Sequence, residues 1–391
     1  MKSIHAAVFL VALVALAIIA WLATRPVALR EETRLDVAEA LGGPADPAFA
    51  RALAAYTFQF PRDHGPHPLF RNEWWYFTGN LRDHLGRRFG YELALFRIAL
   101  TPHAVARQSE WGTNQVYMAH FALTDAGGQR FQFFERFARG AAGLAGARAE
   151  PFAIWLENWG VHAGRQDPHT WRLTAAADDI AIDVTLAPEK PIVLQGDRGL
   201  SQKSDEPGNA SYYYSIPRLA TRGHVTIGDR RHAVQGTSWL DREWSTSALG
   251  SEQVGWDWFA LQFDDGTDLM YYQLRQQDGR NDPHSQGVLI GAKGGARRLQ
   301  AGDVQIEVIR RWQSPRGGSY PAAWRLSVPS EQLTLDVTPV LADQELAVSV
   351  RYWEGAVDVA GTRAGRRLDG VGYAELTGYA ETKEGSLRRL R

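Results

Sequence analysis

Two tryptophan-rich segments resemble each other closely, and this repetition limits the folds that the chain can adopt. The first segment is Glu73–Phe77 (EWWYF) and the second is Gly255–Phe259 (GWDWF). A polar turn and a second aromatic run follow each of them, Tyr91–Phe96 in the first copy and Leu269–Tyr272 in the second. Aromatic residues favour strands, and a strand–turn–strand unit that recurs far along the chain indicates a duplicated domain. We therefore predict two copies of one β-domain.

A second pair of similar segments ends the two copies. Gly236–Trp244 (GTSWLDREW) resembles Gly370–Tyr379 (GVGYAELTGY), because in both a glycine is followed three residues later by an aromatic residue and five residues later by an acid. The first copy is the longer one. We assign its excess to loops, since a closed sheet absorbs extra residues poorly, and the expected hosts are Thr101–Gln115 and Ala187–Ala210.

Most of the chain after Tyr56 has the pattern of short strands joined by turns. Apolar and polar residues alternate in segments such as Ile180–Leu186 and His224–Ile227. Within this part of the chain, helices are expected at Phe131–Ala138 and Ser245–Ala248; before it, a short helix is expected at Arg30–Leu41. Many short antiparallel strands indicate a sandwich or a closed barrel, and the hairpin order favours a lipocalin-like barrel, which can hold one small ligand.

The expected fold is therefore all-β, with two tandem lipocalin-like (calycin-type) antiparallel barrels preceded by an N-terminal hydrophobic helix. The first barrel is assigned to residues 56–246 and the second to residues 247–385. A chain of 391 residues is long enough for two separate cores. Residues 25–55 are expected to form a tether.

The N-terminus has the composition of an export signal or a membrane anchor. Lys2 precedes a nearly unbroken apolar run from Ala6 to Ala23. The run is at the lower limit for crossing a bilayer and exceeds an average signal-peptide core. The small residues that a signal peptidase needs are poorly placed, which disfavours cleavage. The arginines after the run disfavour an anchor with the rest of the protein outside the cytoplasm, because positive charges next to a membrane segment favour the cytoplasmic side. Residues 1–24 are thus either a signal peptide or a signal anchor. We expect an exported protein, periplasmic and either anchored to the inner membrane or secreted.

Composition excludes several classes of function. The formal net charge of −1 gives no reason to expect a nucleic-acid partner. The absence of cysteine excludes disulfides, thiolate nucleophiles and cysteine-ligated zinc. No Gly-x-Ser-x-Gly elbow, phosphate-binding loop or dinucleotide fingerprint occurs, so no cofactor is predicted. His64 and His67 lie close in sequence but lack a third metal ligand, and an exposed loop is the better interpretation.

Acids beside tryptophans are the best candidates for chemistry. Hydration of an alkene needs an acid that protonates carbon, surroundings that tolerate a carbocation, and a water molecule. A buried carboxyl group keeps its proton, and aromatic faces stabilise a cation. Glu73 and Asp241 are therefore the candidate catalytic acids. Alternate residues of a strand share a face, so Glu73 should point with Trp75, and Asp241 should point away from Arg242.

The segment His67–Leu81 (HPLFRNEWWYFTGNL) resembles the signature of the AttH-like proteins, a family related to the carotenoid 1,2-hydratases (hydroxyneurosporene synthases). Gly236–Trp244 and Trp256–Phe259 fit the same family, so the resemblance covers roughly residues 55–385. It implies two lipocalin-like barrels in tandem, export from the cytoplasm, and an ABC-type permease complex as a partner.

The chain departs from the hydratase pattern at two places. The resemblance implies a histidine two residues before the tryptophan that ends the first unit, but Arg242 stands there. Arginine cannot act as a general acid near neutral pH. The expected downstream tyrosine–aspartate pair is also missing, because Gln273 stands two residues after Tyr271. The chain is therefore closer to the AttH-like branch.

Most candidate site residues also have a purely structural interpretation. In lipocalin-like barrels the first-strand tryptophan closes one end of the barrel and stacks on a basic residue. Trp74 or Trp75 would use Arg218 or Arg242 in this way, and the second copy would use a later arginine. Glu73 and Asp241 could equally form buried salt bridges, and His120 could be a core histidine. The candidate ligand-binding residues are Arg71, Trp75, His120, Tyr214, Arg218, Arg242 and Trp244.

Two functions therefore remain open. The first is a protein that binds a hydrophobic or lipid-like small molecule and serves an ABC-type membrane transport system. The second is a hydratase- or hydrolase-type enzyme that acts on an apolar, isoprenoid-like substrate through carboxylic-acid protonation in an aromatic cavity.

Overall fold

The computed structural model describes residues 47–103, 109–247, 249–250 and 252–380. The expected N-terminal hydrophobic helix, the signal or anchor and most of the tether lie outside these residues. Within the described ranges, no helix is both long and apolar enough to span a membrane.

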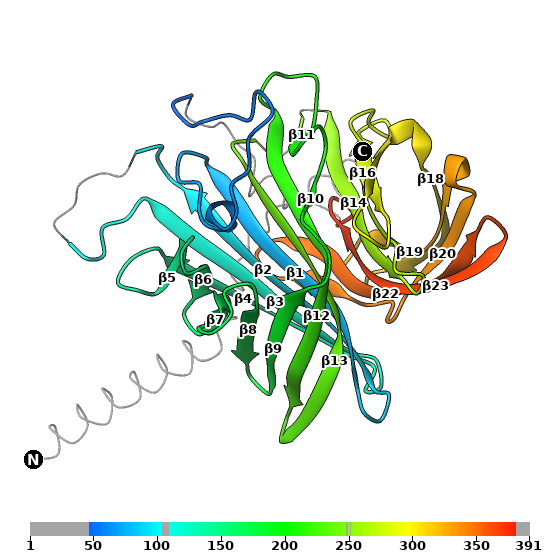
Figure 1. The fold of residues 1–391 in the computed structure, drawn as a ribbon, viewed down its shortest axis with the longest axis horizontal. Helices are drawn as coiled ribbons and strands as arrows, with labels where there is room; N and C mark the ends of the chain where they lie inside the picture. The colour runs from blue at the N-terminus through cyan, green and yellow to red at the C-terminus, as the bar shows by residue number, and fades with distance from the viewer. Residues whose placement is uncertain (1–46, 104–108, 248, 251, 381–391) are drawn as a thin grey trace, which may run out of the picture. The chain divides into compact units, whose positions relative to one another are not determined.

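The described chain is all-β, as predicted, and forms two curled, barrel-like antiparallel sheets (Figure 1). The first sheet consists of β1 (Asn72–Asp83), β2 (Arg88–Ala99), β3 (Gln115–Asp125), β4 (Arg130–Arg139), β5 (Ala145–Arg148), β6 (Ala153–Leu156), β7 (Trp159–Ala163), β8 (Trp171–Ala177), β9 (Ile180–Pro188), β10 (Val193–Leu194), β11 (Leu200–Gln202), β12 (Ala210–Ile227) and β13 (Arg230–Ser245).

The second sheet is smaller and repeats the same plan. It consists of β14 (Gln253–Phe263), β15 (Asp268–Gln276), β16 (Gln286–Ile290), β17 (Ala296–Gln300), β18 (Gln305–Gln313), β19 (Ser319–Val328), β20 (Leu333–Pro339), β21 (Glu345–Ala347), β22 (Arg351–Arg363) and β23 (Arg366–Leu376). Three short 3-10 helices are η1 (Arg62–His64), η2 (Ala301–Asp303) and η3 (Pro329–Glu331).

The strand order confirms the duplication that the tryptophan segments predict. In the first sheet, β1 pairs with β2 and with the last strand, β13. In the second sheet, β14 likewise pairs with β15 and with the last strand, β23. Each copy thus places its tryptophan-bearing strand beside its acid-bearing strand. The register sets Tyr76 opposite Asp241 in one copy and Trp258 opposite Glu375 in the other.

Two expectations about local structure are wrong. Phe131–Ala138 is not helical but forms most of β4. This strand is covered on both sides, with Phe133 against one core and Phe134 against the other, so its sequence lacks a clear alternation. Ser245–Ala248 gives no helix either, since Ser245 ends β13, while residue 248 is outside the described part.

The extra length of the first copy is also not confined to loops. The first sheet has 13 strands and the second has 10. Part of the excess forms the short strands β5 and β6, which extend the first sheet beyond β7. Within Ala187–Ala210, two further short strands, β10 and β11, add to β12. The sheet absorbs these residues because it is curled rather than joined edge to edge.

The segment before β1 closes one end of the first barrel. Ala52, assigned to the tether, is buried in the first core. The expectation of an exposed loop at His64 and His67 is wrong. His64 is buried and its Nδ1 lies 2.7 Å from the hydroxyl of Tyr214. The His67 ring stacks on Trp244 at 3.7 Å between ring centres.

Candidate functional site

The inward face of the first barrel holds a buried ion-pair cluster. As the strand alternation predicts, Glu73 and Trp75 share this face, and Arg242 lies on it as well. The carboxylate of Glu73 accepts hydrogen bonds from the guanidinium groups of Arg97 and Arg242. The Arg242 guanidinium also lies 3.9 Å from the ring centre of Trp75. This is the plug arrangement that lipocalin-like barrels use.

The charge state of Glu73 follows from these contacts. Burial alone would raise the pKa of Glu73, but Arg97 and Arg242 outweigh it and hold the pKa well below its usual range. The side chain is fully buried. Glu73 therefore stays ionised and is placed to organise the barrel rather than to donate a proton.

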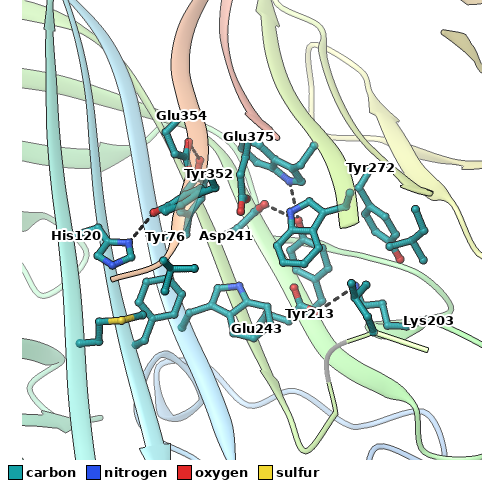
Figure 2. Close-up of a pocket in the computed structure, with 18 residues that line it drawn as sticks. Tyr76, His120, Lys203, Tyr213, Asp241, Glu243, Tyr272, Tyr352, Glu354 and Glu375 are labelled. Atoms are coloured by element: carbon teal, nitrogen blue, oxygen red, sulfur yellow. Dashed lines mark hydrogen bonds and ion pairs between the residues drawn. The ribbon is translucent and has the colours of Figure 1, made fainter. Parts of the chain in front are cut away.

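The opposite, outward face of the same strands lines a cavity between the two sheets. The cavity has a volume of about 90 Å³ and is largely enclosed. Its apolar lining comes from both sheets: Trp74, Tyr76, Phe96, Met118, Leu249, Trp256, Trp258, Tyr272, Leu274 and Val350. Its polar lining consists of His120, Lys203, Tyr213, Asp241, Glu243, Tyr352, Glu354 and Glu375 (Figure 2).

The duplication makes this cavity nearly symmetric. Trp74 of β1 and Trp256 of β14 occupy equivalent positions in the two repeated segments, and both line the cavity. Asp241 of β13 and Glu375 of β23 are equivalent in the same way. The cavity is therefore built where the two copies of one unit face each other.

Asp241 is a buried acid with several donors around it. Its carboxylate accepts hydrogen bonds from the hydroxyl of Ser215 at 2.5 Å, from Nε1 of Trp239 at 2.7 Å and from the hydroxyl of Tyr213. Burial raises the pKa of Asp241 to about 6, and the hydrogen bonds offset part of that rise. Asp241 is therefore mostly ionised at neutral pH but close to its titration point.

Glu375 faces Asp241 from the other sheet (Figure 2). Burial, together with the negative charges of Asp241 and Glu243, raises the pKa of Glu375 to about 8. Glu375 is thus mostly protonated at neutral pH. Two carboxyl groups whose environments push their pKa values apart are the arrangement that supplies an acid and a base in one site.

Two further buried acids, Glu354 and Glu92, form no ion pair with a cation in the part of the chain that the structure describes. Glu354 accepts a hydrogen bond from the hydroxyl of Tyr76 at 2.6 Å. Its other oxygen, and both carboxylate oxygens of Glu92, have no hydrogen-bond partner among the described residues. Burial and mutual repulsion with Glu375 raise the pKa of both groups well above its usual range. They are therefore neutral carboxylic acids.

The two ends of the cavity differ in character. At one end, Nζ of Lys203 pairs with Glu243 at 3.0 Å and lies 4.3 Å from the ring centre of Tyr272. At the other end, Nδ1 of His120 lies 2.6 Å from the hydroxyl of Tyr352. A bound molecule would thus meet the Lys203–Glu243 ion pair at one end and the His120–Tyr352 hydrogen bond at the other.

The structure brings only some of the predicted site residues together. Asp241 and His120 line the cavity. Arg218 instead bonds to Asp268 of the second sheet at 2.6 Å, and Arg71 precedes β1, with its amide bonded to Thr246. Four predicted residues lie inside the first barrel, away from the cavity: Trp75, Tyr214, Arg242 and Trp244.

Several cavity residues were missed by the sequence analysis, and some of them had a signal. Glu375 was visible as the acid of the repeated closing segment but was not proposed as a site residue. Trp258, expected to stack on an arginine, instead donates from Nε1 to the hydroxyl of Tyr213 at 3.2 Å. Lys203 and Glu354 had no signal, because their roles depend on contacts between the copies.

Within the ranges that the structure describes, no group of three or more histidine, aspartate or glutamate side chains is arranged to hold a metal ion.

The hydroxyl of Tyr76, on the cavity wall, donates a hydrogen bond to the buried acid Glu354, and the contribution of this bond to stability can be measured. We expect Tyr76→Phe to lower the free energy of unfolding by about 1–3 kcal/mol, because the buried Glu354 carboxyl loses its hydrogen-bond donor. Urea denaturation measures this change. The control is Tyr56→Phe, which removes a hydroxyl outside the cavity that bonds to Asp63 and Arg62. An equal loss there would show that Tyr76 contributes no more than another hydrogen-bonded tyrosine.

Comparisons with known proteins identify the family. The model of the family described as AttH-like matches residues 51–379. A crystal structure of an AttH protein from Nitrosomonas europaea is 34% identical, with a TM-score of 0.74, and the match covers 85% of this chain and 100% of that one. No curated protein matches the chain.

Two more distant structures share the fold. Kievitone hydratase from Nectria haematococca is 15% identical, with a TM-score of 0.64, and the match covers 88% of this chain and 99% of that one. CghA is 13% identical, with a TM-score of 0.52, and the match covers 86% of this chain and 97% of that one.

Proposed function

Because the chain belongs to the AttH-like family and its two sheets enclose an acid-lined apolar cavity, we propose that it binds an apolar small molecule there and acts on it by acid–base catalysis. The observation that carries this proposal is the pair of carboxyl groups with separated pKa values, Asp241 and Glu375. The acid inside the first barrel, Glu73, is instead paired with the cations Arg97 and Arg242.

The reaction that the site supports best is addition of water to an alkene. Glu375 in its protonated form donates the proton to one alkene carbon, and the carbon–carbon π bond supplies the electron pair of the new C–H bond. A carbocation forms at the other carbon. The faces of Trp74 and Trp256 stabilise that charge through their ring quadrupoles.

Capture of the cation by water completes the addition. A water molecule forms the new C–O bond, and the Asp241 carboxylate accepts the proton that the water loses. Transfer of this proton from Asp241 to Glu375 restores the starting state, so the net reaction adds one water molecule and consumes nothing else. The reverse sequence would dehydrate a tertiary alcohol with the same residues.

The distant relatives support this class of reaction. Kievitone hydratase is named for adding water to its substrate, and it shares the arrangement of two sheets. The chain departs from the carotenoid hydratases at Arg242, but Arg242 lies inside the first barrel and not in the cavity. The departure therefore does not remove an acid from the proposed site.

The two pKa values predict the pH dependence of turnover. Asp241 must be ionised and Glu375 must be protonated, so kcat/KM should rise as the pH increases through about 6 and fall as it increases through about 8. A pH–rate profile measures both limbs, which belong to the coupled pair as a whole. A rate that keeps rising above pH 9 would contradict the role of Glu375 as the acid.

A direct test uses isotopic water. The purified protein is incubated with a panel of prenylated and isoprenoid alkenes in H₂¹⁸O, and the products are analysed by mass spectrometry. We expect one alkene class to gain one ¹⁸O-labelled water. Tight binding of a panel member without any product would reject the enzyme and leave the binding function.

A carrier that serves a membrane transport system is the second candidate. The observation that favours it is that Asp241 already receives three hydrogen bonds within the protein, as a binding-site acid would. Export, membrane attachment and an ABC-type permease partner remain predictions from the sequence. A carrier would bind a member of the alkene panel, and neither the wild-type protein nor any variant would form product from it.

A further inference from the structure

Large exposed apolar side chains gather at one end of the first sheet. Leu69 precedes β1, Leu100 follows β2 and Trp111 precedes β3. Because these strands are antiparallel neighbours, the three positions lie at the same end of the sheet. Leu53 joins them, since the amide of Ala50 bonds to the carbonyl of Leu69 at 2.9 Å. We call Leu53, Leu69, Leu100 and Trp111 the apolar rim.

The rim residues are far more exposed than core packing would allow. Leu53 is 66% exposed, Leu69 60%, Leu100 59% and Trp111 56%. Single exposed apolar residues are normal on protein surfaces, but a group of four at one end of a sheet points to an interaction site.

The rim adjoins the mouth of the cavity between the sheets. Trp74, Leu249 and Trp256 line the cavity and remain partly exposed. Trp74 lies near the start of β1, Leu249 lies between β13 and β14, and Trp256 lies near the start of β14. The connection that carries Leu249 is bonded to the rim segment, because the hydroxyl of Thr246 donates to the carbonyl of Ala50. The opening of the cavity and the apolar rim thus share one end of the molecule.

We propose that the apolar rim inserts into the surface of a lipid bilayer, so that an apolar ligand passes from the hydrocarbon into the cavity without crossing water. Leucine side chains favour the acyl region, and tryptophan favours the interface between headgroups and acyl chains. The ligand class rests on the proposed function of the cavity, whereas the membrane contact rests on the rim itself.

The chain outside the described residues makes a lipid surface the fitting occupant. The apolar run from Ala6 to Ala23 has the composition of a membrane segment, and residues 24–46 separate it from the described part. A fully extended linker of that length reaches at most about 80 Å. A barrel held so close to a bilayer has a high effective concentration there, so a rim of only four side chains suffices for contact.

The natural absence of cysteine allows a clean test. Single cysteines are introduced into the full chain as Leu69→Cys, Leu100→Cys and Trp111→Cys, and each is labelled with the fluorophore NBD. The matched control is Leu85→Cys, which is 81% exposed in the β1–β2 hairpin at the opposite end of the same strands (Figure 1). The probe is a vesicle of phosphatidylethanolamine and phosphatidylglycerol.

We expect the three rim labels to shift their emission to shorter wavelength on vesicle addition and to be quenched by lipids with brominated acyl chains. The control label should stay quenchable by aqueous iodide. Equal iodide quenching at all four sites would overturn the proposal. Protection of the rim from iodide without quenching by brominated lipid would also overturn it, in favour of contact with a second copy of this chain. No substrate is used, so this result is independent of whether the cavity catalyses a reaction.

Discussion

Glu375→Gln is expected to lower kcat by about 10²–10⁴-fold on any alkene that the protein hydrates, because the amide cannot donate a proton to carbon. The substitution is nearly isosteric, so ligand affinity should change little. Steady-state kinetics on the substrate found by the isotopic screen measure both quantities. Glu307→Gln, an exposed acid on β18 of the same sheet, is the matched control and should retain full activity. Full activity of Glu375→Gln would contradict the assignment.

At high pH, Glu375→Gln should also make the folded protein more stable than the wild type. A carboxyl group whose pKa is raised on folding, here from 4.5 to about 8, contributes stability that is fully present below pH 4.5 and is lost as the pH rises through about 8. Glutamine does not titrate, so Glu375→Gln should flatten this loss. Urea denaturation at pH 5 and pH 9 measures it. A joint loss of activity and gain of alkaline stability would separate a functional acid from a structural one.

Glu73→Gln is expected to lower the free energy of unfolding by about 3–5 kcal/mol, because it leaves Arg97 and Arg242 buried without a counter-ion. Equilibrium denaturation in urea measures this loss. Glu157→Gln removes one member of the partly exposed pair with Arg136 and should cost about 1 kcal/mol at most. A similar small cost for Glu73→Gln would contradict the account of the plug.

Failure of Glu73→Gln to fold would leave this account testable. In that case the double variant Glu73→Gln with Arg242→Met removes both a charge and its partner. It should recover part of the lost stability, since fewer buried charges remain unpaired. A double variant that is no more stable than the single one would show that Glu73 and Arg242 do not act as a pair.

The fold was largely predictable because the copies preserve their strand patterns. The tryptophan segment and the closing acid segment recur, and the structure pairs them in each sheet. Strand alternation also separated the two faces correctly, with Glu73 and Arg242 inside the barrel and Asp241 outside. The prediction for β4 was wrong because apolar residues on both faces of this strand resemble a helical pattern.

The site was harder to predict, because it depends on how the two copies face each other. A single lipocalin-like barrel suggests a cavity inside, and the candidates Trp75, Tyr214 and Trp244 follow from that assumption. The structure fills this interior with aromatic rings and ion pairs. The cavity lies between the outer faces instead, so Glu354, Glu375 and their partners could be found only once the packing of the copies was known.

The measurement that tests the central claim most directly is infrared spectroscopy of the carboxyl groups as a function of pH. In D₂O, the wild-type protein should keep an absorption band of protonated carboxyl groups at pH 7, part of which disappears as the pH rises through about 8. In Glu375→Gln, the component of the band that disappears near pH 8 should be missing. The component that persists should remain, because it belongs to the buried carboxyl groups of Glu92 and Glu354. Ionisation of all carboxyl groups below pH 6 would contradict the account.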